Sequence, residues 1–284
     1  MSVSFEPVAL TEITPGPSSL VALDIDGTIL HHDGRISEEV RTAVRRVAGS
    51  GTHVVLSTGR STHATLPVLA ELGLDTGWAV CSNGAVVVRL DPQISGGGYE
   101  FTDVVTFDPG PSLRLLREHL PEGIFAVEDL GRGYAVTSEF PIGELSGVVR
   151  VIDFEQMCAE PAVRVTVRAP GLQSQDFHDL VARSGLHGVS YAVGWTAWLD
   201  IAPDGISKAS GLELVRERLG VAAEATLAAG DGQNDIEMFG WAAVSVAMGG
   251  ADETTRAAAR WHTGPVEADG LVPVLDAVLR EPGH

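Results

Sequence analysis

The stretch Leu20-Val-Ala-Leu23-Asp24-Ile25-Asp26-Gly27-Thr28 decides the fold of this chain of 284 residues. Four apolar residues run into two acids one residue apart, a pattern typical of a short buried strand that ends in a loop. Ser37 then precedes the helical spacing of Val40 and Val44, and Gly49 follows where that helix is expected to end. This order of strand, loop and helix predicts the first unit of a parallel α/β sheet.

The same order recurs before residue 85 and returns after Pro203. We expect further strands at 53–56, 78–81, 226–229 and 244–247 and helices at 66–72, 208–219, 234–240 and 271–280. Successive strand–helix–strand units are right-handed and bring their strands into one sheet. The sequence therefore predicts a Rossmann-like core made of residues 19–84 and 200–284, after a loose lead-in at residues 1–18.

Residues 85–199 differ in character from both parts of the core. Alternating residues predict strands at 164–168 and 191–195, and helices are expected near 112–120 and 174–184. We interpret this segment as an inserted α+β domain. The predicted fold class is α/β, with a parallel-sheet core interrupted by that domain.

The chain is acidic, with 38 Asp and Glu against 19 Lys and Arg and a formal net charge of −19. Such a charge repels nucleic-acid phosphates and anionic membranes, so neither is expected as a partner. Two cysteines make neither a disulfide framework nor a metal cluster. The sequence shows no basic leader before Arg35 and no apolar run of about 20 residues. We expect a cytoplasmic protein, and the sequence does not specify its oligomeric state.

Asp24 and Asp26 are expected at the carboxyl edge of the sheet, where open α/β sheets bind ligands. In an extended segment their side chains point roughly the same way, so the charges repel unless a cation or a shared proton intervenes. Mg²⁺ suits the pair because it takes carboxylate and carbonyl oxygens and retains water. A turn that caps the next helix is the alternative for this pair taken alone.

A second acidic loop, Gly230-Asp231-Gly232-Gln233-Asn234-Asp235, follows a later apolar strand. It is not an EF-hand, because Ile236 and Ala242 stand where that loop needs Gly and Glu. We therefore expect Mg²⁺ as the cofactor. Its expected ligands are Asp24, Asp26 and Asp231, with Asp235 in an outer position.

Two segments offer a positive site for a phosphate. Ser57-Thr58-Gly59-Arg60 brings a hydroxyl, a flexible amide and a guanidinium to a helix start, which attracts anions; a plain N-cap is the alternative. Lys208 is the only lysine among 19 basic residues, and a compact ammonium suits a tight phosphate or carboxylate site where a guanidinium cannot replace it. A solvated lysine after the N-cap Ser207 is the alternative there.

Together and in this order, these segments resemble the motifs of the haloacid dehalogenase superfamily of phosphotransferases, and the position of the insertion resembles its Cof-type or class IIB sugar-phosphatase branch. The resemblance covers residues 20 to about 275. The run from Asp24 to Thr28 matches the first motif, Thr58 the second, Lys208 the third and the loop from Gly230 the fourth. The resemblance implies a Mg²⁺-dependent phosphatase of a small phosphorylated metabolite, such as a sugar phosphate, with residues 85–199 as a C2B-type cap.

The resemblance also implies residue roles. Asp24 would be the nucleophile that forms an aspartyl-phosphate, and Asp26 would bind the metal through its carbonyl and act as general acid, then base. Thr58, the Gly59 amide and Lys208 would hold the phosphoryl oxygens. The remaining implied residues are Asp231 as third metal ligand, Asp235 acting through a metal-bound water, Asn234 at the phosphate, and Asn83 of Ser82-Asn83-Gly84 near the substrate, with Arg60 as a further candidate.

One segment departs from the branch: Gly249-Gly250-Ala251 stands where Gly-Asn-Ala is common, so a polar contact would be missing. A phosphomutase of the same superfamily and a catalytically silent phosphate-binding module are the alternative functions. Isolated His and Trp side chains are more often packing or loop residues than ligands, and basic residues on a strand are more often solvated. We interpret in this way His31, His32, Trp195 and Trp198, and also Arg164 and Arg168.

Overall fold

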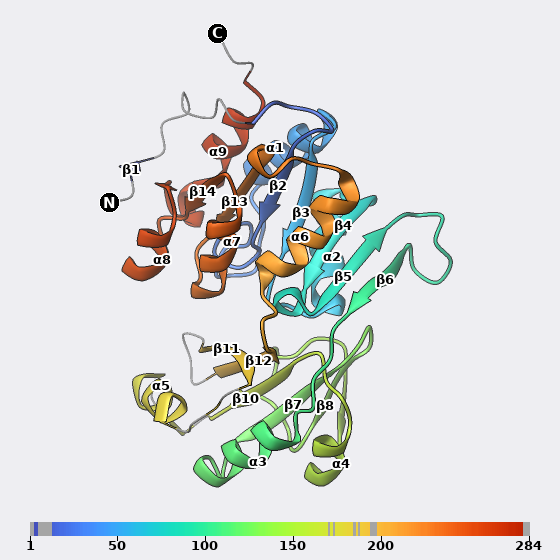
Figure 1. The fold of residues 1–284 in the computed structure, drawn as a ribbon, viewed down its shortest axis with the longest axis vertical. Coiled ribbons are helices and arrows are strands. Elements are labelled where there is room, and N and C mark those ends of the chain that lie inside the picture. The colour runs from blue at the N-terminus through green and yellow to red at the C-terminus, as the bar shows by residue number, and fades with distance from the viewer. Residues whose placement is uncertain are drawn as a thin grey trace.

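The computed structural model describes residues 3–4, 13–169, 171–172, 174–183, 186, 188–193 and 198–280 (Figure 1). Two β-sheets, one of nine strands and one of six, account for its strands. We call them the core sheet and the cap sheet. Over the described ranges, no helix has the length and apolarity needed to cross a membrane.

The core sheet has the strand order β1-β15-β14-β13-β2-β3-β4-β5-β6. Its strands are β1 (Val3–Ser4), β2 (Leu20–Leu23), β3 (His53–Ser57), β4 (Gly77–Cys81), β5 (Val86–Leu90), β6 (Tyr99–Val104), β13 (Thr226–Gly230), β14 (Val244–Ala247) and β15 (Trp261–His262). Neighbours from β1 to β4 are parallel, whereas β5 pairs antiparallel with β4 and with β6. The decisive strand β2 is fully buried between β13 and β3.

Helices cover both faces of the core sheet (Figure 1). They are α1 (Glu38–Gly49), α2 (Thr62–Leu72), α6 (Lys208–Leu219), α7 (Ile236–Trp241), α8 (Glu253–Ala258) and α9 (Leu271–Val278). Because successive strand residues face opposite sides, Val21 and Leu23 pack in one hydrophobic cluster with α1, α2 and α9. Leu20 and Ala22 pack in the other with α6 and α7. The predicted parallel α/β core is confirmed.

Two helices begin at the serines that the sequence indicated. The Ser37 hydroxyl accepts a hydrogen bond from the Val40 amide at 3.1 Å, and Ser207 forms a capping box with Ser210. Gly220 ends α6 in the left-handed conformation, with φ 67°, which a glycine adopts without steric penalty. The helix predicted at 208–219 and the strand predicted at 244–247 occupy those residues.

The cap sheet has the strand order β11-β12-β10-β7-β8-β9. Its elements are β7 (Ile124–Asp129), β8 (Gly133–Val136), β9 (Val148–Val151), β10 (Val165–Arg168), β11 (Val189–Val193) and β12 (Trp198–Pro203), with α3 (Gly110–His119), α4 (Phe154–Ala159) and α5 (Ser174–Arg183). Helices α3 and α4 lie on the face turned away from the core sheet (Figure 1). Val165 and Val167 pack in the cluster formed by these helices, so Thr166 between them points toward the core sheet.

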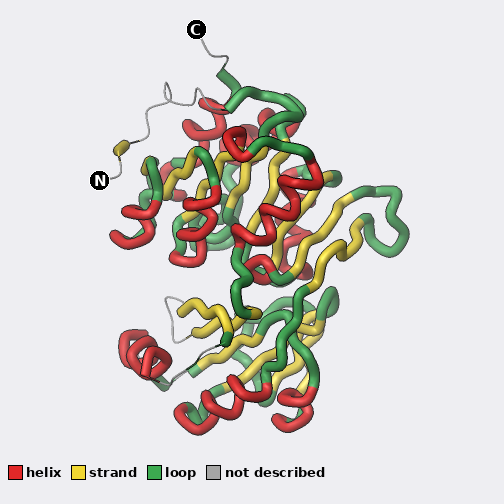
Figure 2. The backbone as a smooth tube through the Cα atoms, viewed as in Figure 1, coloured by secondary structure: helices red, strands yellow, loops and turns green. Residues whose placement is uncertain are grey.

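The structure differs from the sequence expectation at the junctions and at the N-terminus. β5 and β6, expected in the inserted domain, extend the core sheet as a hairpin (Figure 2), and β12 belongs to the cap sheet up to Pro203. An alternating pattern of apolar residues indicates a strand, but it does not specify which other strand pairs with it. In the expected loose lead-in, Val3–Ser4 pair with β15, whereas residues 1–2 and 5–12 lie outside the described residues. Residues 194–195 of the strand expected at 191–195 also lie outside them.

The turn after β4 depends on glycine at position 84. Gly84 has φ 99°, and a Cβ atom there would lie 1.9 Å from the Ser207 carbonyl oxygen. The turn therefore touches the first turn of α6 with no room for a side chain.

We expect Gly84→Ala to lower the free energy of unfolding by about 2–4 kcal/mol, because it combines a left-handed alanine with a backbone clash. Gly34→Ala is the matched control, since Gly34 has φ 83° but open space around its Cβ position; strain alone there is expected to contribute about 1 kcal/mol. Urea unfolding measures both variants. Equal losses would show that the contact with Ser207 is unimportant.

Candidate active site

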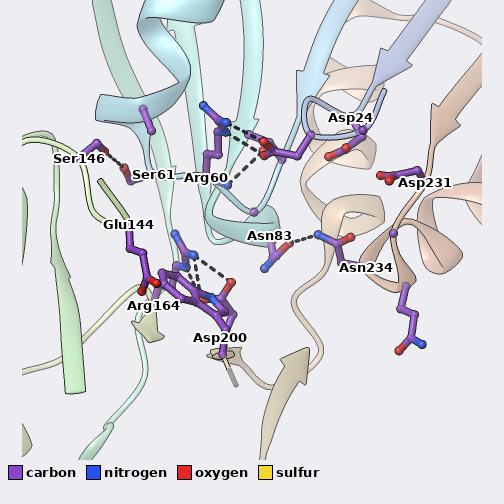
Figure 3. Close-up of a pocket in the computed structure, with 18 of the residues that line it drawn as sticks. Asp24, Arg60, Ser61, Asn83, Glu144, Ser146, Arg164, Asp200, Asp231 and Asn234 are labelled. Atoms are coloured by element: carbon purple, nitrogen blue, oxygen red, sulfur yellow. Dashed lines mark hydrogen bonds and ion pairs between the residues drawn. The ribbon is translucent and has the colours of Figure 1, made fainter. Parts of the chain in front are cut away.

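The residues singled out in the sequence meet at the carboxyl ends of three neighbouring strands (Figure 3). Asp24 follows β2, Thr58 follows β3 and Asp231 follows β13. Since these strands are parallel and adjacent, their carboxyl ends form one edge, and a ligand can touch all three loops at once.

Lys208 lies buried beneath this edge, at the first position of α6. Its Nζ atom is 2.5 Å from Asp24 Oδ1 and 2.5 Å from Asp235 Oδ1, and its side chain has no solvent exposure. Burial disfavours the ammonium, but the two carboxylates outweigh it and raise the pKa of Lys208 above its ordinary value. Lys208 is therefore a buried cation with two anionic partners, and its interpretation as a solvated helix-start lysine is wrong.

Three carboxylates crowd around that single ammonium. One oxygen from each of Asp24, Asp231 and Asp235 lies within 4.8 Å of the others. Burial raises the pKa of Asp24 well above its usual range, and Lys208 only partly counteracts this. Burial, with the nearby Asp235 charge, also raises the pKa of Asp231 to about 7. With all three carboxyl groups ionised, the cluster would carry more negative charge than Lys208 neutralises, and this mutual repulsion is one reason why both pKa values are raised.

The donor set fits a hard divalent cation. Asp235 uses Oδ1 for Lys208 and accepts hydrogen bonds through Oδ2 from the amides of Asp231 and Gly232, both at 2.9 Å. Asp235 therefore stabilises the loop that contains Asp231 and Gly232. The carboxylates of Asp24 and Asp231 remain available to bind a cation. Carboxylate oxygens in excess of the local positive charge are the ligands that Mg²⁺ takes.

Gly27 explains why the first loop can come so close to the second. It has φ 73°, and a Cβ atom at this position would lie 2.1 Å from Asp231 Oδ2. Only glycine combines this backbone conformation with that approach.

The side chain of Asp26 has a different partner from that of Asp24. Arg60 donates to both of its carboxylate oxygens, with Nε at 2.8 Å and Nη2 at 2.6 Å (Figure 3). The Asp26 side chain is 61% exposed, whereas Asp24 is buried. Each acid therefore has its own basic partner: Lys208 pairs with Asp24, and Arg60 pairs with Asp26.

Polar groups from two further loops complete this side of the site. Thr58 Oγ1 accepts a hydrogen bond from the Arg60 amide at 3.1 Å, and the Asn234 amide group donates to Asn83 Oδ1 at 3.0 Å. Together with Gly59, these side chains line a cavity of about 720 Å³ that opens between the two sheets. Every residue predicted for the site except Lys208 and Asp235, which lie beneath it, lines this cavity.

The model of the haloacid dehalogenase-like hydrolase family matches residues 21–95 and 160–275, which is more than half of the chain. The chain belongs to this family. It is 29% identical over 276 residues to the putative phosphatase YkrA of Bacillus subtilis, covering 89% of this chain and 95% of that protein. It is 28% identical over 281 residues to the pyridoxal phosphate phosphatase YbhA of Escherichia coli, covering 90% and 97%.

A solved structure shares the whole fold of this hydrolase. The subclass IIB sugar phosphatase BT4131 aligns with a TM-score of 0.75 and 21% identity, over 91% of this chain and 98% of that chain. The resemblance to the haloacid dehalogenase superfamily is confirmed by the match to the family model. The predicted enzyme class, a phosphoric monoester hydrolase, is confirmed at this level.

The cap sheet supplies the opposite wall of the cavity in this hydrolase. Arg164 donates to Asp200 Oδ1 and Oδ2, both at 2.9 Å, and to the Tyr134 hydroxyl at 3.1 Å (Figure 3). Arg164 is 6% exposed, so its interpretation as part of a solvated strand face is wrong. It alternates with Val165 and Val167, which occupy the cap's own hydrophobic cluster, and so it faces the cavity.

The remaining side chains fall into three groups. Trp198 and His32 line the cavity; His32 lies in a loop and Trp198 packs edge-on against Phe140, in agreement with their interpretation as loop and packing residues. His31 is buried, 3.9 Å from Asp269, and Arg168 pairs with Glu144 at 3.0 Å with a side chain only 15% exposed. Trp195 lies outside the described residues. No pattern in the sequence pointed to Tyr134, Glu144 or Asp200, because a single polar residue on a strand or in a turn carries no positional signal.

We expect Lys208→Met to lower the free energy of unfolding in metal-free buffer by about 3–5 kcal/mol, because it leaves two buried carboxylates without their cation. Adding Asp235→Asn to this variant should restore part of the loss by removing one of those charges. Chemical denaturation measures both. A Lys208→Met variant as stable as the natural chain would mean that the carboxylates find other partners.

Proposed function

We propose that this hydrolase is a Mg²⁺-dependent phosphatase that transfers the phosphoryl group of a small phosphomonoester to Asp24 and then to water. The observation that carries the proposal is the buried Lys208 ammonium held between Asp24 and Asp235, with Asp231 alongside, at the floor of the cavity. In-line phosphoryl transfer depends mainly on positioning and charge stabilisation, and this floor offers both.

The positions of the side chains support the proposed roles. Asp24 Oδ1 is held by Lys208, which leaves the other oxygen of Asp24 to attack phosphorus. The Thr58 hydroxyl, the Gly59 amide and Asn234 line the cavity where the phosphoryl oxygens would lie. Asp24, Asp231 and the Asp26 carbonyl would hold Mg²⁺, with Asp235 behind them. The bound ion would neutralise charge on the phosphoryl oxygens.

A carboxylate nucleophile splits hydrolysis into two displacements. Asp24 displaces the alcohol and forms an aspartyl-phosphate, and water then attacks phosphorus and frees Asp24. Asp26 lines the cavity beside Asp24, so it can protonate the departing alkoxide and later accept a proton from the water. Arg60 fixes the direction of the Asp26 carboxylate through two hydrogen bonds.

The proposed substrate carries one phosphate and an uncharged, hydroxyl-rich remainder, as in a sugar phosphate. Both arginines of the cavity wall described here are engaged: Arg60 by Asp26 and Arg164 by Asp200. A second anionic group would have to displace a carboxylate from one of these pairs, whereas hydroxyl groups can donate to the carboxylate oxygens of Asp200. In this proposal residues 85–199 act as the cap and residues 19–84 and 200–284 as the catalytic core, with the β5–β6 hairpin attached to the core.

We expect Asp24→Asn to lower kcat by at least about a thousandfold, because the amide cannot form the covalent intermediate. Asp33→Asn, at an exposed position, is the matched control. The assay is phosphate release from a panel of sugar phosphates, nucleotides and pyridoxal phosphate. Chelation with EDTA should abolish phosphate release, and added Mg²⁺ should restore it. An Asp24→Asn variant with the kcat of the natural chain would rule out this mechanism. A requirement for a bisphosphate activator would favour a phosphomutase.

We expect Asp26→Asn to distinguish between leaving groups. For alkyl phosphates kcat should fall by about a hundredfold or more, because the alkoxide needs a proton, but for p-nitrophenyl phosphate by less than about tenfold, because nitrophenolate departs without one. Steady-state kinetics on both substrates tests this. Equal losses would assign Asp26 a role other than proton transfer.

A further inference from the structure

The turn that carries Asn83 into the cavity has an unfavourable backbone conformation. Ser82 and Asn83 have φ values of 51° and 53°, and Gly84 has 99°. Left-handed non-glycine residues cost about 1–3 kcal/mol each and persist only where their surroundings fix them. The contacts of Ser82 and Asn83 therefore decide where the Asn83 side chain points.

Two backbone hydrogen bonds tie this turn to the phosphate-side loop. The Ser82 amide donates to the Arg60 carbonyl at 2.9 Å, and the Asn83 amide donates to the Thr58 carbonyl at 3.0 Å. The Ser82 side chain makes a third bond in another direction: its hydroxyl donates to Glu128 Oε2 at 2.6 Å. Glu128 belongs to β7 of the cap sheet, so this bond joins the two sheets.

Glu128 is held firmly on the cap side. It is 6% exposed, and its amide donates to the Arg164 carbonyl at 3.2 Å. Burial raises the pKa of its carboxyl, and the charge of Arg164 and the Ser82 hydroxyl partly counteract this. The nearby cap residues Leu130 and Val163 pack into the hydrophobic cluster of the core sheet, so this corner of the cap is anchored on the core.

The other end of the turn reaches the site. Asn83 Oδ1 accepts a hydrogen bond from Asn234 Nδ2 at 3.0 Å, and it lies 3.1 Å from the position of a Cβ atom on Gly59. A continuous path of contacts therefore runs from Glu128 through Ser82 and Asn83 to Asn234.

We propose that Glu128 is a positioning residue: by holding the Ser82 hydroxyl, this cap carboxyl fixes the turn and aims Asn83 at the bound phosphomonoester. The inference rests on the proposed phosphatase function. It assigns the cap a task beyond forming a wall, because a hydrogen bond between the cap and the core also helps to place a core side chain.

The test compares Glu128→Ala, Ser82→Ala and the double variant by steady-state phosphate release. Each single variant should lower kcat/KM by about tenfold, as expected for loss of a hydrogen bond to a carboxyl. The loss should appear mainly in KM, because Asn83 contacts the substrate before and during the reaction. The double variant should lose no more than either single one, because both remove the same bond. Glu128→Gln keeps an acceptor oxygen and should stay within about threefold of the natural chain.

Glu122→Ala, at an exposed cap position, is the matched control and should leave the kinetics unchanged. Unchanged kcat/KM in Glu128→Ala would overturn the inference, as would losses that multiply in the double variant. A lower melting temperature with unchanged kinetics would also overturn it, since it would show a structural role only.

A measurement that does not depend on enzymatic activity tests this inference separately from the proposed function. The side-chain ¹⁵N–¹H resonances of Asn83, assigned by their absence in Asn83→Asp, should shift in Glu128→Ala and Ser82→Ala but not in Glu122→Ala. If the natural chain releases no phosphate from any substrate, the proposed function fails, and these resonances alone decide whether Glu128 positions Asn83. Unmoved resonances would overturn the inference.

Discussion

The contact of the Lys208 ammonium with Asp24 and Asp235 is the constraint on which the site depends. A buried cation must have its anionic partners at close range, since an unpaired buried charge is strongly destabilising. This requirement fixes the start of α6 against the ends of β2 and β13. Asp235 in turn holds the amides of Asp231 and Gly232, so the position of the second acidic loop also follows from it.

Two neighbouring acids of the site have different surroundings. Asp24 is buried and pairs with Lys208, whereas Asp26 is largely exposed and forms an ion pair with Arg60. A buried carboxylate held by an ammonium has a fixed position, which suits a nucleophile. An exposed carboxylate near the cavity mouth can exchange protons with water, which suits a general acid and base. The division of labour that we propose therefore follows from burial and partner.

One segment of the cap sheet has two functions. Val165 and Val167 of β10 build the cap's own core with α3 and α4, while Arg164, directly before β10, faces the cavity. A polar residue buried this way needs partners, and Asp200 and Tyr134 provide them. Glu128 on the neighbouring strand reaches the core instead. The wall of the cavity and the docking of the cap are thus made by adjacent strands.

The sequence by itself determined the parallel core, the helix at 208–219 and the identity of the polar residues at the strand ends. These are local features: apolar runs, cap residues and acids directly after strands act through neighbours in the chain. Even the unusual Lys208 was visible, because it is the only lysine.

Only the tertiary structure decided which charge pairs with which. Lys208 and Asp24 are 184 residues apart, and nothing local distinguishes Arg60 as the partner of Asp26 or Asp200 as that of Arg164. The tertiary fold also assigned the β5–β6 hairpin to the core sheet and turned Arg164 and Trp198 into the cavity. Pairing of charges and of strands depends on distances in space between segments remote in sequence, and a pattern of residue types along one chain does not contain those distances.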